Sequence, residues 1–361
     1  MINEYEINLS FKTLFQAFFQ FYNQKHRQKL ENLFGSWFKS NIYSTGSGSD
    51  SLLIILKDIE KKKGKGEIIC PNYSCKAIPR TIIKAGFKPV FVDINSRISL
   101  DLKQVKKAVS DKTKAILIYH PWGFMHDKNI FYFCKKKKIL CIEDCARGMG
   151  GIKGKRFGSF GDYSFFSFRT GKLINAGSGS IIISKEKLNI NLRKYPKILS
   201  LVNLLDLFLR KIKNLPKLKA IFDYLFDSID QYQIGNMECF LILNYLEKIK
   251  QIEQNRTRNY GELKKIFVNI KFNECSPIPL SFPLFLENRG KWEKIFKSQE
   301  VNARAYYCHV NSNEFKKFKY FGDEMSKKVA KQILNLPVHE LLGKKEINQI
   351  KKILQNVKNS N

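Results

Sequence analysis

Short apolar segments alternate with longer segments of helical periodicity through the middle of the chain. Between residues 45 and about 184, each apolar run is followed by roughly 10 to 15 residues whose apolar positions recur at helical spacing. Such alternation is typical of a mainly parallel sheet covered by helices on both faces. We therefore predict an α/β fold with strands at residues 67–70, 89–93, 114–120, 139–143, 163–168 and 180–183.

Helical patterns flank this region. The first 44 residues contain two helix-like stretches. The first is amphipathic and rich in aromatic residues, with Phe11, Phe15, Phe18, Phe19 and Tyr22, and the second is at 30–38. Residues 187–231 are helical in pattern and rich in Leu and Lys, with apolar runs at 201–209 and 218–225. Residues 237–264 predict one long helix.

The remainder of the chain predicts a smaller lobe. It has strand-like segments at 282–286 and 333–336 and a closing helix at 345–357. We therefore expect an N-terminal helical segment at 1–44, a large domain at 45–264 with a helical insert at about 187–231, and a small C-terminal domain at 265–361.

Composition adds few constraints. A chain of 361 residues with 43% hydrophobic residues can bury a sizeable core. Its eight cysteines form no CxxC pair, which argues against a zinc ribbon and against a disulfide framework. The first residues are acidic where a signal peptide is basic, and no apolar run reaches the roughly 18 to 20 residues of a membrane span. We expect a cytoplasmic protein.

The net charge of +32 raises two alternatives, a nucleic-acid surface and an anionic membrane surface. The excess is mainly lysine in short runs next to apolar helical positions, which favours solvated helix faces. No zinc-finger spacing, RNA-recognition pattern or basic-zipper heptad is present. The stretch 187–231 has the composition of a membrane-surface helix, although packing on the protein body is the favoured interpretation.

Two residues indicate a chemical site. Lys172 follows the predicted strand 163–168 and precedes the Gly/Ser run 177–180, and Asp144 follows the predicted strand 139–143. Ligands of parallel sheets bind at the carboxyl ends of the strands. A buried amine and a buried carboxylate held by neighbouring strands suit pyridoxal 5'-phosphate (PLP), because the amine bonds to the cofactor aldehyde and the carboxylate keeps the pyridine nitrogen protonated.

A Gly/Ser loop at 45–51 precedes the apolar run 52–56. Such a loop at the start of a helix presents backbone N–H groups and the positive end of the helix dipole to an anion, although a plain helix cap has the same composition. It lacks the Lys-Ser/Thr ending of a Walker A loop and the glycine spacing of a dinucleotide fingerprint. His120, at the end of a predicted strand, is interpreted as a structural, hydrogen-bonded histidine.

Taken in order, these segments resemble the DegT/StrS-type sugar aminotransferases, a branch of the fold-type-I PLP enzymes. The resemblance extends from about residue 30 to 357. It is based on segments 47–52, 86–93, 120–127 and 142–146, residues 161–162, 167–168 and Lys172, and segment 334–339. It implies a mainly parallel, seven-stranded-type sheet in a three-layer large domain, plus a smaller C-terminal α/β lobe.

The resemblance also implies residue roles. Lys172 would hold PLP covalently and move the proton during catalysis, and Asp144 would pair with the pyridine nitrogen. Gly48, Ser49 and Ser167 would hold the cofactor phosphate. In a homodimer with its active site at the interface, Asn236 would reach the phosphate bound by the neighbouring subunit.

Three positions depart from the family pattern. Arg147 stands where relatives commonly have a Gln that contacts the phenolic oxygen of the cofactor, and its fixed charge would alter the site. The position of the aromatic residue that stacks on the ring falls near Cys75, which leaves Tyr73 as a substitute. The usual Gly-Glu-Gly-Gly after the lysine is replaced by the run 177–180.

The implied activity is amino transfer through PLP and its amino form, pyridoxamine phosphate (PMP). The donor would be an amino acid, by family habit glutamate, and the acceptor a nucleotide-linked keto sugar for cell-surface polysaccharide or glycoconjugate synthesis. Family members that dehydrate sugars usually carry His in place of the lysine, so Lys172 favours amino transfer. The alternatives are an inactive PLP-binding scaffold or regulator, and a basic protein associated with membrane or nucleic acid.

Overall fold

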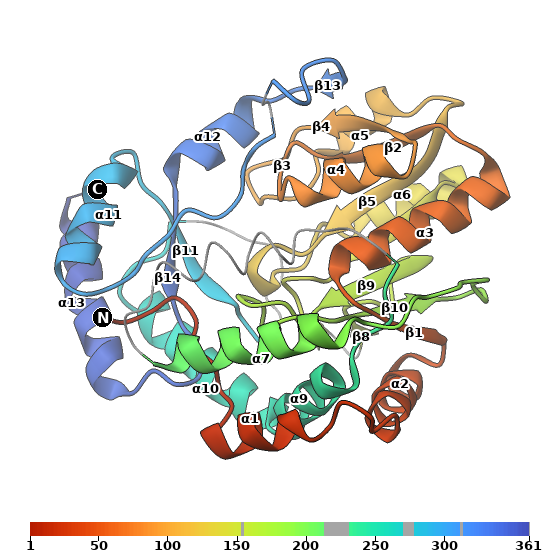
Figure 1. The fold of residues 1–361 in the computed structure, drawn as a ribbon. Coiled ribbons are helices and arrows are strands. Elements are labelled where there is room, and N and C mark those ends of the chain that lie inside the picture. Colours follow the sequence, from red (N-terminus) through yellow and green to blue (C-terminus); the bar gives the residue numbers. More distant parts are fainter. Residues whose placement is uncertain (153–154, 213–230, 270–277, 311–312, 361) are drawn as a thin grey trace.

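The computed structural model describes residues 1–152, 155–212, 231–269, 278–310 and 313–360. Among these, a central sheet has eight strands in the order β1-β10-β9-β6-β5-β2-β4-β13 (Figure 1). From β9 to β13 all neighbours are parallel, and β10 pairs antiparallel with both β9 and β1. The strand bounds are Asn41–Thr45 (β1), Glu67–Pro71 (β2), Lys88–Val92 (β4), Thr113–Tyr119 (β5), Leu140–Asp144 (β6), Tyr163–Ser167 (β9), Ser180–Ser184 (β10) and Lys319–Phe321 (β13).

The predicted mainly parallel α/β fold and its six strands are confirmed. Two further strands, β1 and β13, bring the sheet to eight, one more than the family resemblance implies. β1 has polar residues at both ends, and β13 has three residues, so neither produces a readable alternation. β1 also lies within the segment that was expected to be helical. β13 comes from the region 265–361 yet pairs with β4, so part of that region belongs to the main sheet.

Alternating side chains fill both faces of the sheet. On β5, Ala115 and Leu117 join a core with helices α3 and α4, while Ile116 and Ile118 join a core with α5 and α6. This two-sided burial explains the nearly continuous apolar runs of these strands. The helix bounds are Gly48–Lys63 (α3), Ala77–Lys84 (α4), Leu102–Ala108 (α5) and Asn129–Lys137 (α6).

A third core lies beneath β9 and β10, where helices from distant parts of the sequence meet (Figure 1). Leu14, Phe34, Leu204 and Leu241 are buried there. The helices are Phe11–Phe18 (α1), Lys25–Phe38 (α2), Lys197–Lys211 (α7) and Asn236–Glu247 (α9). Helix α7 thus packs on the protein body, as favoured for the insert 187–231; the apolar run 218–225 lies outside the described residues.

The C-terminal region contains the antiparallel pair β11 (Ser281–Phe285) and β14 (Ile333–Pro337) and a closing helix α13 (Lys344–Asn359), as predicted. The predicted long helix 237–264 is instead two helices, α9 and α10 (Ile249–Lys264), because the backbone leaves the helical conformation at Lys248. No Gly or Pro marks this break in the sequence. Further elements are α11 (Arg289–Ser298), α12 (Glu324–Gln332), the 3-10 turn η1 (Pro121–Gly123), and strands β3 (Tyr73–Ser74), β7 (Gly151–Ile152), β8 (Lys155–Arg156) and β12 (Cys308–His309).

Two expectations from composition can be compared with the described residues. None of their helices is both long and apolar enough to span a bilayer. Six cysteines have described side chains and all are free thiols, buried except for Cys75. Cys275 lies outside the described residues.

A buried ion pair joins α10 to the segment after β14. Arg256 Nε lies 2.7 Å from Glu340 Oε2, and both side chains are almost fully buried. Replacing Arg256 by Met should lower the free energy of unfolding by about 3–5 kcal/mol, because Glu340 would keep a buried charge without its partner. Urea unfolding measures the loss.

The double variant Arg256→Met/Glu340→Leu should recover most of that stability, since no charge is then left buried. Lys265→Met, which removes the exposed pair with Glu262, is the control and should leave the unfolding midpoint nearly unchanged. A single variant as stable as the parent would contradict this account of the pair.

Candidate functional site

A cavity of about 300 Å³ opens at the carboxyl ends of β5, β6 and β9. Tyr119, Asp144 and Ser167 are the last residues of these three parallel strands, and all three line the cavity. The start of α3, the start of α4 and the turn after β9 complete the wall. Of the predicted site residues, the cavity brings together Gly48, Ser49, Cys75, Asp144, Ser167 and Lys172.

Lys172 enters the cavity from a tight turn that follows β9. The Lys172 N–H donates to the carbonyl of Arg169 over 3.1 Å, and Gly171 has a φ of +84°, which a side chain would strain. Burial, and after it the positive charge of Arg147, lowers the pKa of the Lys172 amine to about 8, although Cys75 and Asp144 act in the opposite direction. A neutral, nucleophilic amine is therefore more accessible here than on an ordinary lysine.

Asp144 ends β6 with 8% of its surface exposed, at the cavity wall. Its Oδ1 accepts the Ala146 N–H over 2.8 Å. Burial raises the pKa of the carboxyl group, opposed by that N–H and by the positive charge of Lys172. A cationic partner in the cavity would therefore be stabilised by this carboxylate.

The start of α3 forms an anion seat. The hydroxyl of Ser47 caps the helix by accepting the Asp50 N–H over 3.1 Å. The N–H groups of Gly48 and Ser49 belong to the first turn, so they have no acceptor inside the helix. A side chain at position 48 would come within 3.3 Å of Ser167 Cβ, so glycine keeps the space between α3 and β9 open. The seat combines the backbone N–H groups of α3, the hydroxyl of Ser167 and the positive end of the helix dipole.

Tyr73 does not line the cavity. Its ring is fully buried, and its hydroxyl donates to the carbonyl of Tyr306 over 2.5 Å. Successive side chains of a strand point to opposite sides, so the cavity-lining Ser74 leaves Tyr73 behind the wall. Tyr307 lines the cavity on this side, and it meets Tyr73 edge-on at 5.7 Å.

Arg147 also lies behind the wall. Its guanidinium stacks over the ring of Tyr306 at 3.9 Å, with Tyr307 at 5.0 Å, and hydrogen-bonds to Glu4. Nε and Nη1 of Arg147 are buried and have no hydrogen-bond partner among the described residues. Arg147 does not line the cavity, and its positive charge lowers the pKa of Lys172; its expected contact with the cofactor stays a prediction.

Asn236 begins α9, and its side-chain amide donates to the carbonyl of Phe21 over 2.8 Å. It does not line the cavity of its own chain. Its expected role across a subunit interface stays a prediction.

Sequence reasoning missed several cavity residues. The buried hydroxyl of Tyr119 has no hydrogen-bond partner in the described part of the chain. The place of Tyr119 at the end of a strand beside Asp144 was the available signal. Tyr307 has a φ of +61°, a rare backbone state that its packing against Tyr73 and Tyr119 holds in place. Nothing in the sequence connects residue 307 to this wall. Lys76, Arg80 and Arg169 give the remaining wall basic character.

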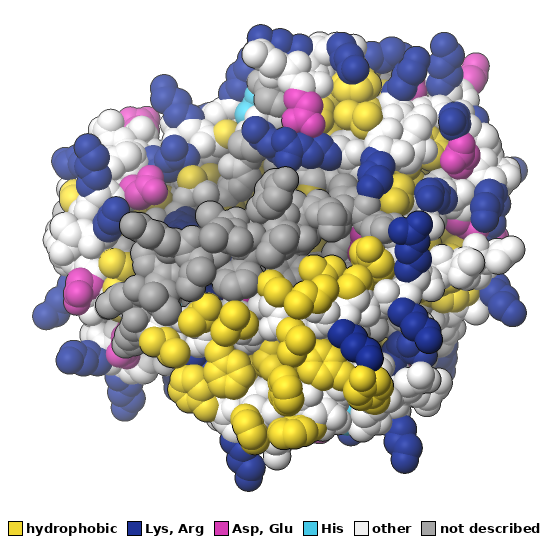
Figure 2. Space-filling model, in the orientation of Figure 1, with side chains coloured by type: hydrophobic (Ala, Val, Ile, Leu, Met, Phe, Trp, Pro, Cys, Tyr) yellow, Lys and Arg dark blue, Asp and Glu magenta, His cyan; other side chains and the backbone are white. Residues whose placement is uncertain are grey.

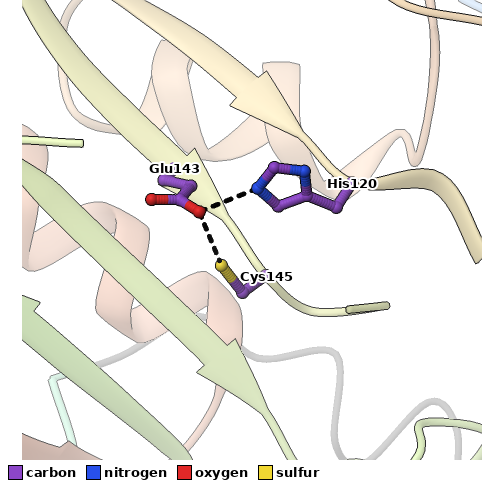
Figure 3. Close-up of side chains that lie close together, drawn as sticks. All are labelled: His120, Glu143 and Cys145. Atoms are coloured by element: carbon purple, nitrogen blue, oxygen red, sulfur yellow. Dashed lines mark hydrogen bonds and ion pairs between the residues drawn. The ribbon is translucent and has the colours of Figure 1, made fainter. Parts of the chain in front are cut away.

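His120, Glu143 and Cys145 form a buried cluster (Figure 3). His120 and Glu143 are next in sequence to Tyr119 and Asp144, which line the cavity. Glu143 Oε1 accepts from His120 Nε2 at 2.8 Å and from the Gly158 N–H at 2.7 Å, with Cys145 Sγ at 3.6 Å. Oε2 accepts the N–H groups of Phe160 and Gly161. Although burial opposes its charge, these donors hold the pKa of Glu143 below its ordinary value.

The Glu143 oxygens are thus occupied by protein donors, which indicates a structural anchor in place of a metal site. The ring of His120 also stacks on Phe157 at 4.3 Å. The structural interpretation of His120 is confirmed.

Comparison with known proteins identifies the relatives of this fold. The chain is 30% identical over 171 residues to the GDP-perosamine synthase of Vibrio cholerae, which is 46% of each protein. It is 24% identical to the dTDP-3-amino-3,6-dideoxy-alpha-D-galactopyranose transaminase of Aneurinibacillus thermoaerophilus, over 84% of this chain and 82% of that one. The chain spans about half or less of the length of the curated relatives that it matches most strongly.

Among solved structures, a GDP-4-keto-6-deoxymannose-3-dehydratase with a trapped PLP-glutamate geminal diamine has the same fold. The TM-score is 0.77 at 19% identity, over 98% of this chain and 100% of that one. The model of the DegT/DnrJ/EryC1/StrS aminotransferase family matches residues 16–355. The chain therefore belongs to the DegT/DnrJ/EryC1/StrS aminotransferase family.

Proposed function

We propose that this protein is a PLP-dependent aminotransferase that moves an amino group from glutamate to a keto sugar carried on a nucleoside diphosphate. The observation that carries the proposal is the convergence of the Lys172 amine, the Asp144 carboxylate and the anion seat of α3 on one cavity. When bound, PLP supplies an aldehyde that bonds to an amine and a protonated ring that takes up electrons. In the net reaction the amino acid becomes a 2-oxo acid, and the keto carbon of the sugar becomes an amino-bearing carbon.

The cavity residues suit this cofactor. The N–H groups of Gly48 and Ser49 and the hydroxyl of Ser167 would bind its phosphate, and Asp144 would hold the proton on its ring nitrogen. Lys172 would attach it and then carry the proton between the cofactor carbon and the sugar carbon. The hydroxyl of Tyr119, buried and without a hydrogen-bond partner among the described residues, is a further donor in the wall.

Lys172 favours amino transfer over sugar dehydration, because dehydratases of this family usually carry His at its position. Relatives named for GDP- and dTDP-linked amino sugars support a nucleotide-linked acceptor for cell-surface polysaccharide or glycoconjugate synthesis. We further infer a cytoplasmic homodimer in which Asn236, at the start of α9, approaches the phosphate bound by the neighbouring subunit.

Replacing Lys172 by Ala should abolish covalent attachment of the cofactor and turnover. In the parent, borohydride reduction followed by peptide mass spectrometry should place the cofactor on Lys172. Lys185→Ala is the control, since this exposed lysine pairs with Asp162 away from the cavity. Full activity in the Lys172 variant would contradict the assignment of Lys172 as the residue that binds the cofactor covalently.

Glutamate should lower the visible absorbance of the PLP-loaded protein, because the cofactor would pass to its amino form. Glutarate, which has the same two carboxylates and no amino group, should leave the spectrum unchanged. Adding GDP- or dTDP-linked keto sugars should then restore the absorbance when the correct acceptor is present. An inactive scaffold would hold PLP yet show no response to glutamate in this measurement.

Arg147→Gln should raise the pKa of Lys172 in the cofactor-free protein above about 8, because removal of a nearby positive charge stabilises the ammonium form. The pH at which Lys172 becomes half reactive toward an acylating reagent, read by mass spectrometry, should move upward. Arg304→Gln changes an exposed arginine and should not move it. An unchanged or lower midpoint in the Arg147 variant would show that its charge does not act on Lys172.

A further inference from the structure

Helices α1 and α7 together expose a large apolar surface (Figure 2). Tyr22 is 78% exposed, and Phe19 and Ile198 are each 64% exposed. We call this surface the aromatic patch; its members are Phe11, Phe15, Phe18, Phe19, Tyr22, Ile198, Leu201 and Leu205. Large contiguous apolar surfaces mark sites of interaction more often than scattered single residues do.

Helix α7 buries the polar Ser200 and Asn203 beside Leu204 and Leu207, and it exposes apolar residues on its other side. Ser200 and Asn203 face the interior, where they hydrogen-bond to the buried Glu238 over 3.0 and 3.2 Å. Ile198, Leu201 and Leu205, at spacings of three and four residues, are exposed. The outer side of a surface helix usually has polar residues, so three exposed apolar side chains on α7 are unusual.

Helix α1 has two apolar stripes. Leu14 and Ala17 are buried and anchor the helix to the body, whereas Phe11, Phe15 and Phe18 follow helical spacing on the exposed side. The predicted amphipathic stretch is thus present, but its aromatic residues face outward. Leu14 and Ala17 thus attach the helix to the protein body, and most of the aromatic stripe is left exposed to solvent.

The two helices form one continuous surface. Phe11 stacks on Phe208 at 6.0 Å at one end, and at the other Lys197 Nζ donates to the Tyr22 hydroxyl over 2.7 Å. The ammonium group also lies 4.1 Å from the centre of the Tyr22 ring. The helices are therefore antiparallel neighbours, as Figure 1 shows.

The charge around the aromatic patch is basic. Helix α1 contains no acidic residue, and Asp206, the one acidic residue of α7, is buried and paired with Arg210 at 2.6 Å. Exposed lysines on these helices and beside them include Lys12, Lys25, Lys194 and Lys197. Aromatic side chains with lysines at their border suit the headgroup region of an anionic bilayer.

We propose that the aromatic patch binds the surface of an anionic lipid bilayer. A second copy of the chain is a poorer partner, because a twofold contact through this patch would set lysines against lysines without exposed carboxylates from α1 or α7. The helices would lie along the bilayer surface with their aromatic residues inserted. This attachment is independent of the amino-transfer activity, and it would hold the enzyme at the membrane.

The test is co-sedimentation of the full chain with vesicles at about 0.15 M ionic strength. The protein should bind vesicles of phosphatidylcholine and phosphatidylglycerol, and bind those of phosphatidylcholine alone more weakly. The double variant Phe15→Ser/Phe19→Ser should lose roughly tenfold or more of this binding, because two aromatic side chains no longer enter the bilayer. Tyr132→Ser, which changes an exposed aromatic residue of α6, is the matched control and should bind like the parent.

Circular dichroism and cofactor content should be the same in all three proteins. Absence of binding by the parent, or equal binding by the double variant, would overturn the proposal. If the parent does not bind vesicles and is a dimer, and the double variant has the molar mass of a monomer, the patch would be assigned to contact with a second copy.

Discussion

One buried carboxylate, Glu143, fixes the edge of the sheet on which the site is built. Its oxygens accept hydrogen bonds from His120, at the end of β5, and from three N–H groups at 158, 160 and 161, just before β9. One side chain in β6 therefore ties together the three strands whose ends form the cavity. Because side chains alternate along a strand, the next residue, Asp144, faces the cavity.

The charges around Lys172 act in opposing directions. Burial and Arg147 disfavour its ammonium form, whereas Cys75 and Asp144 favour it. Arg147 is held away from the cavity by Tyr306 and Glu4, so its charge acts through space and occupies none of the binding volume. The departure from the family at this position thus changes the electrostatics of the site while leaving its lysine, carboxylate and anion seat in place.

Helix α9 supports the aromatic patch through its contact with α7. Glu238 of α9 receives the inward-facing polar groups of α7, and the same helix begins with Asn236. Ser200 and Asn203 on the buried side of α7 therefore have polar partners in the interior, while Leu201 and Leu205 are exposed. The composition of the insert 187–231 suggested two alternatives, binding to a membrane surface and packing on the protein body. The two are compatible in this arrangement.

The family resemblance added Gly48, Ser49 and Ser167 to the predicted site. Periodicity and strand ends in the sequence were enough to predict the six main strands, the parallel sheet, and the meeting of Lys172 and Asp144 at one edge of the sheet. These features depend on local alternation and on one rule, that parallel strands end at the same edge. Tertiary structure alone decided the outcome for Tyr73, Tyr307, Arg147 and α1. Tyr307 reaches the cavity wall from a distant part of the chain, Tyr73 and Arg147 lie behind that wall, and the aromatic stripe of α1 faces outward because Leu14 and Ala17 already fill the core. Which of two apolar stripes is buried, and which of two neighbouring aromatic residues meets a cavity, depends on contacts between distant segments, and no local pattern in the sequence encodes them.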